Sequence, residues 1–221
     1  MPGTTWSTLH ERALDRYGYV TTDDAREEGI DPTYLRLMGR RGTIEHVGYG
    51  LYRFPQVPVT EHTHLMEAVL WVGDGAVLSH DSVLSMHGLA NANPSIVRVT
   101  TPRRVRKSGT PSPIEIIRRP LPGEDLTVYN GIPSTTVARA LLDCRELIMR
   151  SRLLEAAHEA RSEGLIRRHA FDALLAELAR QSAGHRPAPL PVGPRSTHRG
   201  GRTGPNPSQR RHTGAVLATG S

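Results

Sequence analysis

Apolar residues at helical spacing predict the first helix of the chain, and capping residues predict the second. Four apolar residues recur at intervals of three and four positions in the first segment: Trp6, Leu9, Ala13 and Tyr17. This spacing predicts an amphipathic helix that ends at Gly18. Residues 20–24, Val-Thr-Thr-Asp-Asp, then offer capping side chains for a short second helix that reaches Glu28 and ends at Gly29.

A third helix and a hairpin complete the N-terminal pattern. Asp31 and Pro32 form a strong start signal, because Asp caps a helix and Pro suits its first position. This helix ends at Gly42, and residues 43–47 and 51–54 alternate like two paired strands around a Gly-Tyr-Gly turn. Helix, helix, tight turn, helix, hairpin is the order of a winged helix-turn-helix.

The middle of the chain mixes helical and extended patterns, and therefore predicts an α+β region. Ser79 and Ser134 are the expected caps of two of its helices. The predicted helices cover 61–72, 79–87, 134–148, 153–162 and 168–181, and the predicted strands cover 96–100, 114–118 and 126–129.

Shifts in composition divide the chain into three parts. Two prolines within residues 54–60 predict an extended linker between a winged helix-turn-helix at 1–56 and an α+β domain at 61–182. Residues 183–221 are rich in Pro, Gly, Ser, Thr and Arg, and we expect a disordered tail because so few large apolar residues cannot offset the entropy of ordering. No signal peptide and no apolar run of membrane-spanning length is visible, so we expect a cytoplasmic protein with no membrane partner.

The charge of the chain is unevenly placed. The formal net charge is +6, but the tail carries six arginines and no acidic residue. Removing those six from the 28 basic residues leaves 22, which equals the 22 acidic residues of the chain. A basic tail can attract nucleic acid without specificity, but we favour a tail with no role. The argument for nucleic-acid binding must therefore come from local patches.

The third predicted helix carries such a patch. Thr33, Arg36 and Arg40 project on one face, while Leu35 and Met38 lie opposite and suit a core. A recognition helix needs this division, and Arg can grip guanine with two hydrogen bonds or hold a phosphate. An ordinary solvated helix face is the alternative, and the helix order and wing favour DNA binding over it. The predicted DNA contacts are Thr33, Arg36, Leu37, Arg40 and Arg41 on the helix and His46, Tyr49 and Arg53 on the hairpin.

A second basic patch follows the strand predicted at 96–100. It consists of Arg103, Arg104, Arg106 and Lys107. A loop that grips phosphates, a surface for an acidic protein and a plain solvated loop all fit these residues, and the sequence leaves the three open.

No catalytic or metal-binding pattern stands out. The histidines at 62, 64, 80 and 87 lack a recognised metal spacing, and the single Cys144 excludes an internal disulfide and a cysteine-based zinc site. Asp81 and Ser82 beside His80 do not make a triad, because geometry defines a triad. We therefore expect no enzyme, no cofactor and no metal. A nuclease that lost its catalytic part is a weaker alternative, since no cluster of carboxylates and lysine is present.

Several blocks of the sequence resemble the AbiEi family of antitoxins from type IV toxin–antitoxin systems, between about Leu9 and Leu165. The blocks that carry the resemblance read ALDRYGYVTTDDAREEGI, YLRLMGRRGTIEHVGYGLYRF, GAVLSHDSVLSMHGL, IVRVTTPRRVRK and NGIPSTTVARALLD. The chain departs from the family pattern after Ser182.

The resemblance implies a function. Its N-terminal winged helix would bind inverted repeats in double-stranded DNA of its own promoter and repress it, with Thr33, Arg36, Arg40, Arg41 and Tyr49 reading the DNA. Its α+β antitoxin domain would counteract a nucleotidyltransferase-like toxin without forming a stable complex. The alternatives are a stand-alone protein-interaction module that meets an acidic partner, or a regulator with no toxin.

Overall fold

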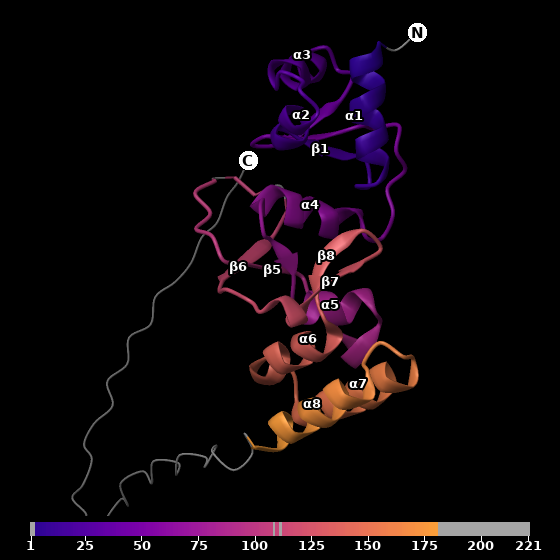
Figure 1. Ribbon diagram of the computed structural model, residues 1–221, viewed down its shortest axis with the longest axis vertical. Coiled ribbons are helices and arrows are strands. Elements are labelled where there is room, and N and C mark those ends of the chain that lie inside the picture. Colours follow the sequence, from indigo (N-terminus) through magenta and orange to yellow (C-terminus); the bar gives the residue numbers. More distant parts are fainter. Residues whose placement is uncertain (1–2, 108, 111, 181–221) are drawn as a thin grey trace, which may run out of the picture. The chain divides into compact units, whose positions relative to one another are not determined.

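The computed structural model describes residues 3–107, 109–110 and 112–180 (Figure 1). The tail predicted to be disordered at 183–221 lies outside the described residues. The first six elements are α1 (Thr4–Leu14), β1 (Tyr19–Thr21), α2 (Thr22–Glu27), α3 (Thr33–Arg40), β2 (Glu45–Gly48) and β3 (Leu51–Arg53). The three strands form an antiparallel sheet in the order β1-β3-β2. This is a winged helix-turn-helix, and the predicted fold class is confirmed.

Side-chain caps set the two helices of the helix-turn-helix. Thr21 and Asp24 form a capping box at the start of α2, in which each side chain accepts a hydrogen bond from the backbone N–H of the other residue. Asp31 accepts a hydrogen bond from the N–H of Thr33 at 2.7 Å, so it caps α3 as predicted, although the helix begins at Thr33. Gly42, at φ 72°, takes the left-handed conformation that ends α3.

The three-stranded sheet is covered on both faces. Val20 and Tyr52 point into a core with the helices of the winged unit, which includes Leu9, Leu35 and Met38. The alternate residues Tyr19 and Leu51 belong to a second core together with residues of the next helix, α4 (Thr63–Val72). Strand β1, which the sequence analysis missed, therefore serves both cores.

A mixed sheet organises the rest of the described chain. Its strands are β4 (Val77–Leu78), β5 (Val97–Thr101), β6 (Ile114–Arg118), β7 (Leu126–Tyr129) and β8 (Ile132–Thr135), in the order β6-β5-β4-β8-β7. Strands β5 and β6 pair in parallel, as do β4 and β8, and the other two pairs are antiparallel.

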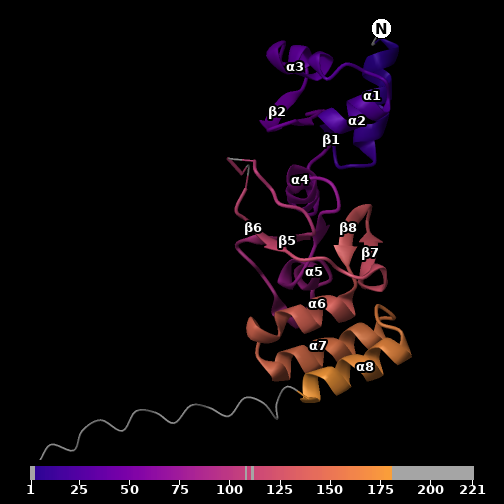
Figure 2. The ribbon, with the colours of Figure 1, turned by 60° about the vertical axis from the view of Figure 1, so that its left-hand side comes forward.

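Helices cover this sheet on both sides. They are α4 on one side and α5 (Asp81–Met86), α6 (Val137–Asp143), α7 (Arg150–Ser162) and α8 (Arg168–Arg180) on the other, as both views show (Figure 1, Figure 2). Short 3-10 segments lie at Leu89–Asn91, Gly123–Asp125 and Cys144–Glu146. Within the described part of the chain, none of the helices has the length and apolar character needed to cross a bilayer.

Two predicted helix caps are wrong. Ser79 lies between β4 and α5, and its hydroxyl accepts a hydrogen bond from Thr100 at 2.8 Å instead of capping a helix. Ser134 is buried in β8, and the cap of α6 is Thr136. The predicted long helix at 134–148 is therefore a strand, a seven-residue helix and a 3-10 turn.

Candidate nucleic-acid interface

Helix α3 presents a polar face to solvent and an apolar face to the core. Leu35 and Met38 are buried among the side chains of the winged unit. The five residues predicted to contact DNA from this helix and its end are all exposed: Thr33, Arg36, Leu37, Arg40 and Arg41. Leu37 is 40% exposed, so it lies on the outer face beside the arginines. The rotation of α3 about its axis is thus the one that the sequence pattern predicts.

Contacts on the inner side of α3 hold this rotation. A Cβ atom at Gly39 would lie 3.4 Å from the ring of Tyr52, an ordinary van der Waals distance, so this side of the helix faces strand β3. On the outer side, the Arg36 guanidinium donates a hydrogen bond to the Thr33 hydroxyl at 3.0 Å. The hydrogen bond from the backbone N–H of Thr33 favours the charged carboxylate and so lowers the pKa of Asp31.

The acidic residues of α2 are neutralised within the winged unit. Arg12 of α1 forms ion pairs with Asp24 at 3.2 Å, with Glu28 at 3.1 Å and with Glu27. Arg16 adds a second ion pair to Asp24 at 2.6 Å, and Arg26 pairs with Asp23.

The arginines of α3 stand in contrast. Among the residues that the structure describes, Arg36, Arg40 and Arg41 form no ion pair. The winged unit thus uses four arginines (Arg12, Arg16, Arg26 and Arg53) to pair with its own carboxylates and leaves another three at the recognition face. An exposed cluster of unpaired positive charge attracts phosphate.

The hairpin contributes two exposed side chains and one buried one. Tyr49 lies at the tip and is 74% exposed, and His46 is exposed with its ring 5.1 Å from the ring of Tyr52. Arg53 is only 9% exposed. Its guanidinium donates to the carbonyl oxygen of Val57 at 2.5 Å and lies 3.6 Å from Glu45. Arg53 therefore joins β3 to β2 and to the segment after β3, and we leave it out of the proposed DNA contacts.

Helix α4 braces the base of the hairpin. A Cβ atom at Gly48 would lie 2.9 Å from Cδ1 of Trp71, so the indole fits directly under the turn. The Tyr19 hydroxyl donates a hydrogen bond to Glu67, and burial raises the pKa of Tyr19. The sequence analysis missed Trp71 and Gly48, because a contact between residues so far apart leaves no local pattern.

The second basic patch is partly anchored. Arg103 pairs with Asp74 at 3.2 Å, and both side chains are 70% exposed. The Lys107 ammonium donates a hydrogen bond to the Trp71 carbonyl at 2.7 Å and lies 6.0 Å from the centre of the Trp71 ring. Burial lowers the pKa of Lys107, while Asp23 and Asp74 oppose this shift. Arg104 and Arg106 are exposed.

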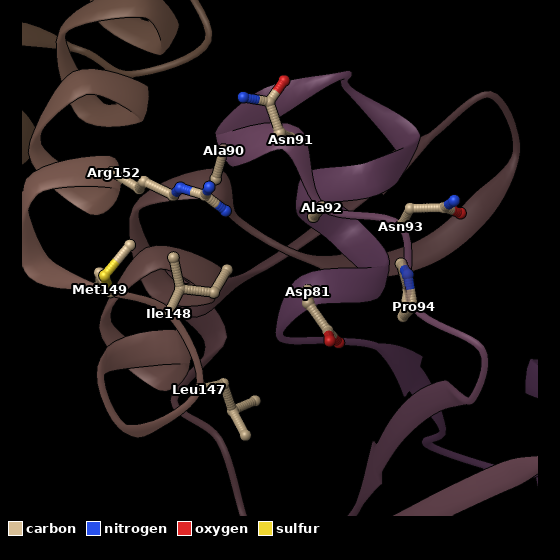
Figure 3. Close-up of a pocket in the computed structure, with 10 residues that line it drawn as sticks. All are labelled: Asp81, Ala90, Asn91, Ala92, Asn93, Pro94, Leu147, Ile148, Met149 and Arg152. Carbon is tan, nitrogen blue, oxygen red and sulfur yellow. The ribbon is translucent and has the colours of Figure 1, made fainter.

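A pocket of about 250 Å³ lies elsewhere, between α5 and α7 (Figure 3). Its wall combines the apolar side chains of Leu147, Ile148 and Met149 with polar ones such as Asp81 and Arg152. The ten lining residues include no serine, cysteine or histidine. Within the described residues, no group of three or more His, Cys, Asp and Glu side chains is placed to hold a metal ion.

The comparisons with known proteins bear on the winged unit. Residues 7–55, which run from α1 to the end of the hairpin, match the protein family described as "Transcriptional regulator, AbiEi antitoxin". The chain is also similar to the crystal structure of the RV2827C protein from Mycobacterium tuberculosis, at 17% identity and a TM-score of 0.46, over 80% of this chain and 72% of that chain. No curated protein matches the chain.

Proposed function

From the premise that the chain belongs, through residues 7–55, to the AbiEi antitoxin family of transcriptional regulators, we propose that α3 reads the major groove of an operator. We also propose that the bound protein represses its own promoter. The observation that carries the proposal is the exposed, unpaired cluster of Arg36, Arg40 and Arg41 on a helix whose opposite face is buried.

The dimensions of α3 suit this task. An α-helix with its side chains is about 10–12 Å across, which fits the major groove of about 12 Å, and the eight residues of α3 make about two turns along it. Arg36 and Arg40 lie one turn apart on the same face, and each guanidinium can give two hydrogen bonds to O6 and N7 of a guanine. Thr33 sits at the N-terminal end of the helix, where recognition helices contact base edges. Leu37 lies beside the arginines and suits the methyl group of a thymine.

The remaining side chains suit contacts to the DNA backbone. Arg41 follows the last residue of α3 and flanks the reading face, so we assign it to a phosphate. Tyr49 and His46 project from the hairpin, in the position from which a wing reaches the backbone beside the groove. An operator of inverted repeats calls for two copies of the chain, with half-sites about one helical turn or a multiple of it apart.

We extend the proposal to an antitoxin role, which rests on the family description. The region 61–182 would counteract a nucleotidyltransferase-like toxin without a stable complex. The protein would act in the cytoplasm as a regulator with no enzymatic activity. Co-expression with a nucleotidyltransferase encoded beside its gene tests this part: rescue of growth supports the antitoxin role, and continued toxicity with repression intact indicates a regulator without a toxin.

Binding to the DNA just upstream of its own gene tests the DNA-reading part. The full chain should bind this DNA more tightly than a scrambled sequence. Arg36→Ala and Arg40→Ala should each weaken operator binding by about 1–3 kcal/mol and affect scrambled DNA much less. Arg167→Ala, at an exposed arginine just before α8, is the matched control and should leave the preference unchanged. Unchanged operator affinity in both α3 variants would remove α3 as the reading helix.

A further inference from the structure

The loop that follows β5 lies next to the base of the wing. We propose that this loop, through Arg103, Arg104 and Arg106, contacts phosphates of the duplex beyond those reached by the wing, and so lengthens the DNA interface. The inference rests on the proposed function, because it assumes that α3 and the hairpin face DNA. Of the three possibilities that the sequence leaves open for this patch, the inference selects the loop that binds phosphates over a surface for an acidic protein and a plain solvated loop.

The loop is held in a fixed orientation by alternate residues. Val105 is half-buried and packs against the main core. Two residues later, Lys107 turns its ammonium group toward the protein and donates to the Trp71 carbonyl at 2.7 Å. Successive side chains of an extended segment point to opposite sides. Arg104 and Arg106, which flank Val105, are accordingly exposed.

Trp71 connects the loop to the wing. Its carbonyl oxygen and ring hold Lys107, and its indole lies directly under Gly48 of the hairpin. Asp23 at the start of α2 is also near enough to act on the charge of Lys107. Both views draw the loop after β5 beside α4, on the side toward which the β2–β3 hairpin projects (Figure 1, Figure 2).

The charges of the loop are available to a partner. Arg104 and Arg106 form no ion pair among the described residues, and the single pair of Arg103 with Asp74 is largely exposed. Exposed pairs of this kind contribute about 0–1 kcal/mol and exchange readily for a phosphate. An acidic protein surface would also suit these charges, but their place beside the wing favours the polyanion that the wing itself faces.

Salt dependence gives the measurable signature of this contact. Each phosphate neutralised on duplex DNA adds about 0.9 to the slope of log K against log [salt]. The double variant Arg104→Ala/Arg106→Ala should therefore lower the slope by about 1.8, so that its affinity falls about 12-fold less than that of the wild type between 50 and 200 mM salt. At low salt the double variant should bind both DNAs more weakly than the wild type does. The loss of affinity should be equal for the upstream and the scrambled DNA, because phosphate contacts carry no sequence information.

The experiment compares full-length proteins on both DNAs across this salt range, with hydroxyl-radical footprints of the bound upstream DNA. The matched control is Arg167→Ala/Arg168→Ala, which removes the same charge from two exposed arginines at the start of α8, on the opposite side of the second sheet from α4. The arginines of residues 183–221 are present in the wild type and in both variants, so their contribution to the salt dependence cancels when the slopes are compared. We expect the loop variant alone to lose slope and to shorten the footprint at each half-site, with an unchanged preference for upstream DNA.

Each other outcome overturns one statement. A loop variant with the wild-type slope, or a control that loses as much, overturns the inference while selective binding by the wild type upholds the proposed function. A wild type that binds both DNAs equally, while the loop variant still loses slope, overturns the proposed function alone. A loop variant that keeps its DNA binding but loses rescue of a toxin would assign the loop to a protein partner instead.

Discussion

Replacement of Gly48 by alanine should loosen the wing from α4. The new Cβ would lie 2.9 Å from Cδ1 of Trp71, closer than a Cβ atom tolerates, and 3.1 Å from Nε1, a tight contact. The indole is 1% exposed and rigidly enclosed, so either the turn or the ring has to move. Overfilling of a packed site costs about 1–3 kcal/mol. The backbone at Gly48 has no positive φ, so this cost comes from the contact and not from backbone strain.

Thermal unfolding and DNA binding measure the two consequences. A chain of this size should lose about 2–4 °C in Tm for each kcal/mol. Gly123→Ala is the matched control, because it also lacks a positive φ and has no neighbour within 4 Å of its new Cβ. We expect Gly48→Ala to lower Tm and to weaken DNA binding, and Gly123→Ala to change neither. A Gly48→Ala protein with the Tm and DNA affinity of the wild type would refute the brace between Trp71 and the wing.

Two further predictions concern buried groups. Asp24→Ala should destabilise the protein by about 1–3 kcal/mol in urea unfolding, because it removes the buried carboxylate that accepts hydrogen bonds from Thr21 at the start of α2 and pairs with Arg12 and Arg16. Asp23→Ala, which breaks only an exposed pair, should cost less than about 1 kcal/mol, and equal losses would contradict the argument. Cys144 is fully buried, and burial raises its pKa to about 12. Alkylation at pH 8 should thus be about a thousandfold slower in the folded protein than in urea, and comparable rates would contradict its burial.

Local patterns were sufficient to predict the orientation of α3. The alternation of apolar and polar residues over one helix, with Asp31 before it and Gly42 after it, contains all the information needed for the buried and exposed faces. The same holds for β6 and β7, whose observed bounds are those predicted. In each case the decisive interactions lie within one element or at its ends.

Interactions between distant segments explain what sequence reasoning missed. Strand β4 has two residues, and only its pairing with β5 and β8 makes it a strand. Strand β8 left one local signal, the Asn130-Gly131 pair, whose positive φ angles form the two-residue turn from β7. Arg53 was predicted to face DNA because it lies on the hairpin, but the segment that ends at Val57 folds back over it.

The wing is therefore built by more than the residues that match the regulator family. Residues 7–55 contain α3 and the hairpin, but Tyr19 and Leu51 bury their side chains in the core that α4 helps to form. A fragment that ended at the linker would expose both side chains and would lose the indole under Gly48. Since the same Trp71 also holds Lys107, the position of the wing and that of the basic loop depend on one side chain outside the matched segment. The region after the linker thus contributes directly to the proposed DNA interface.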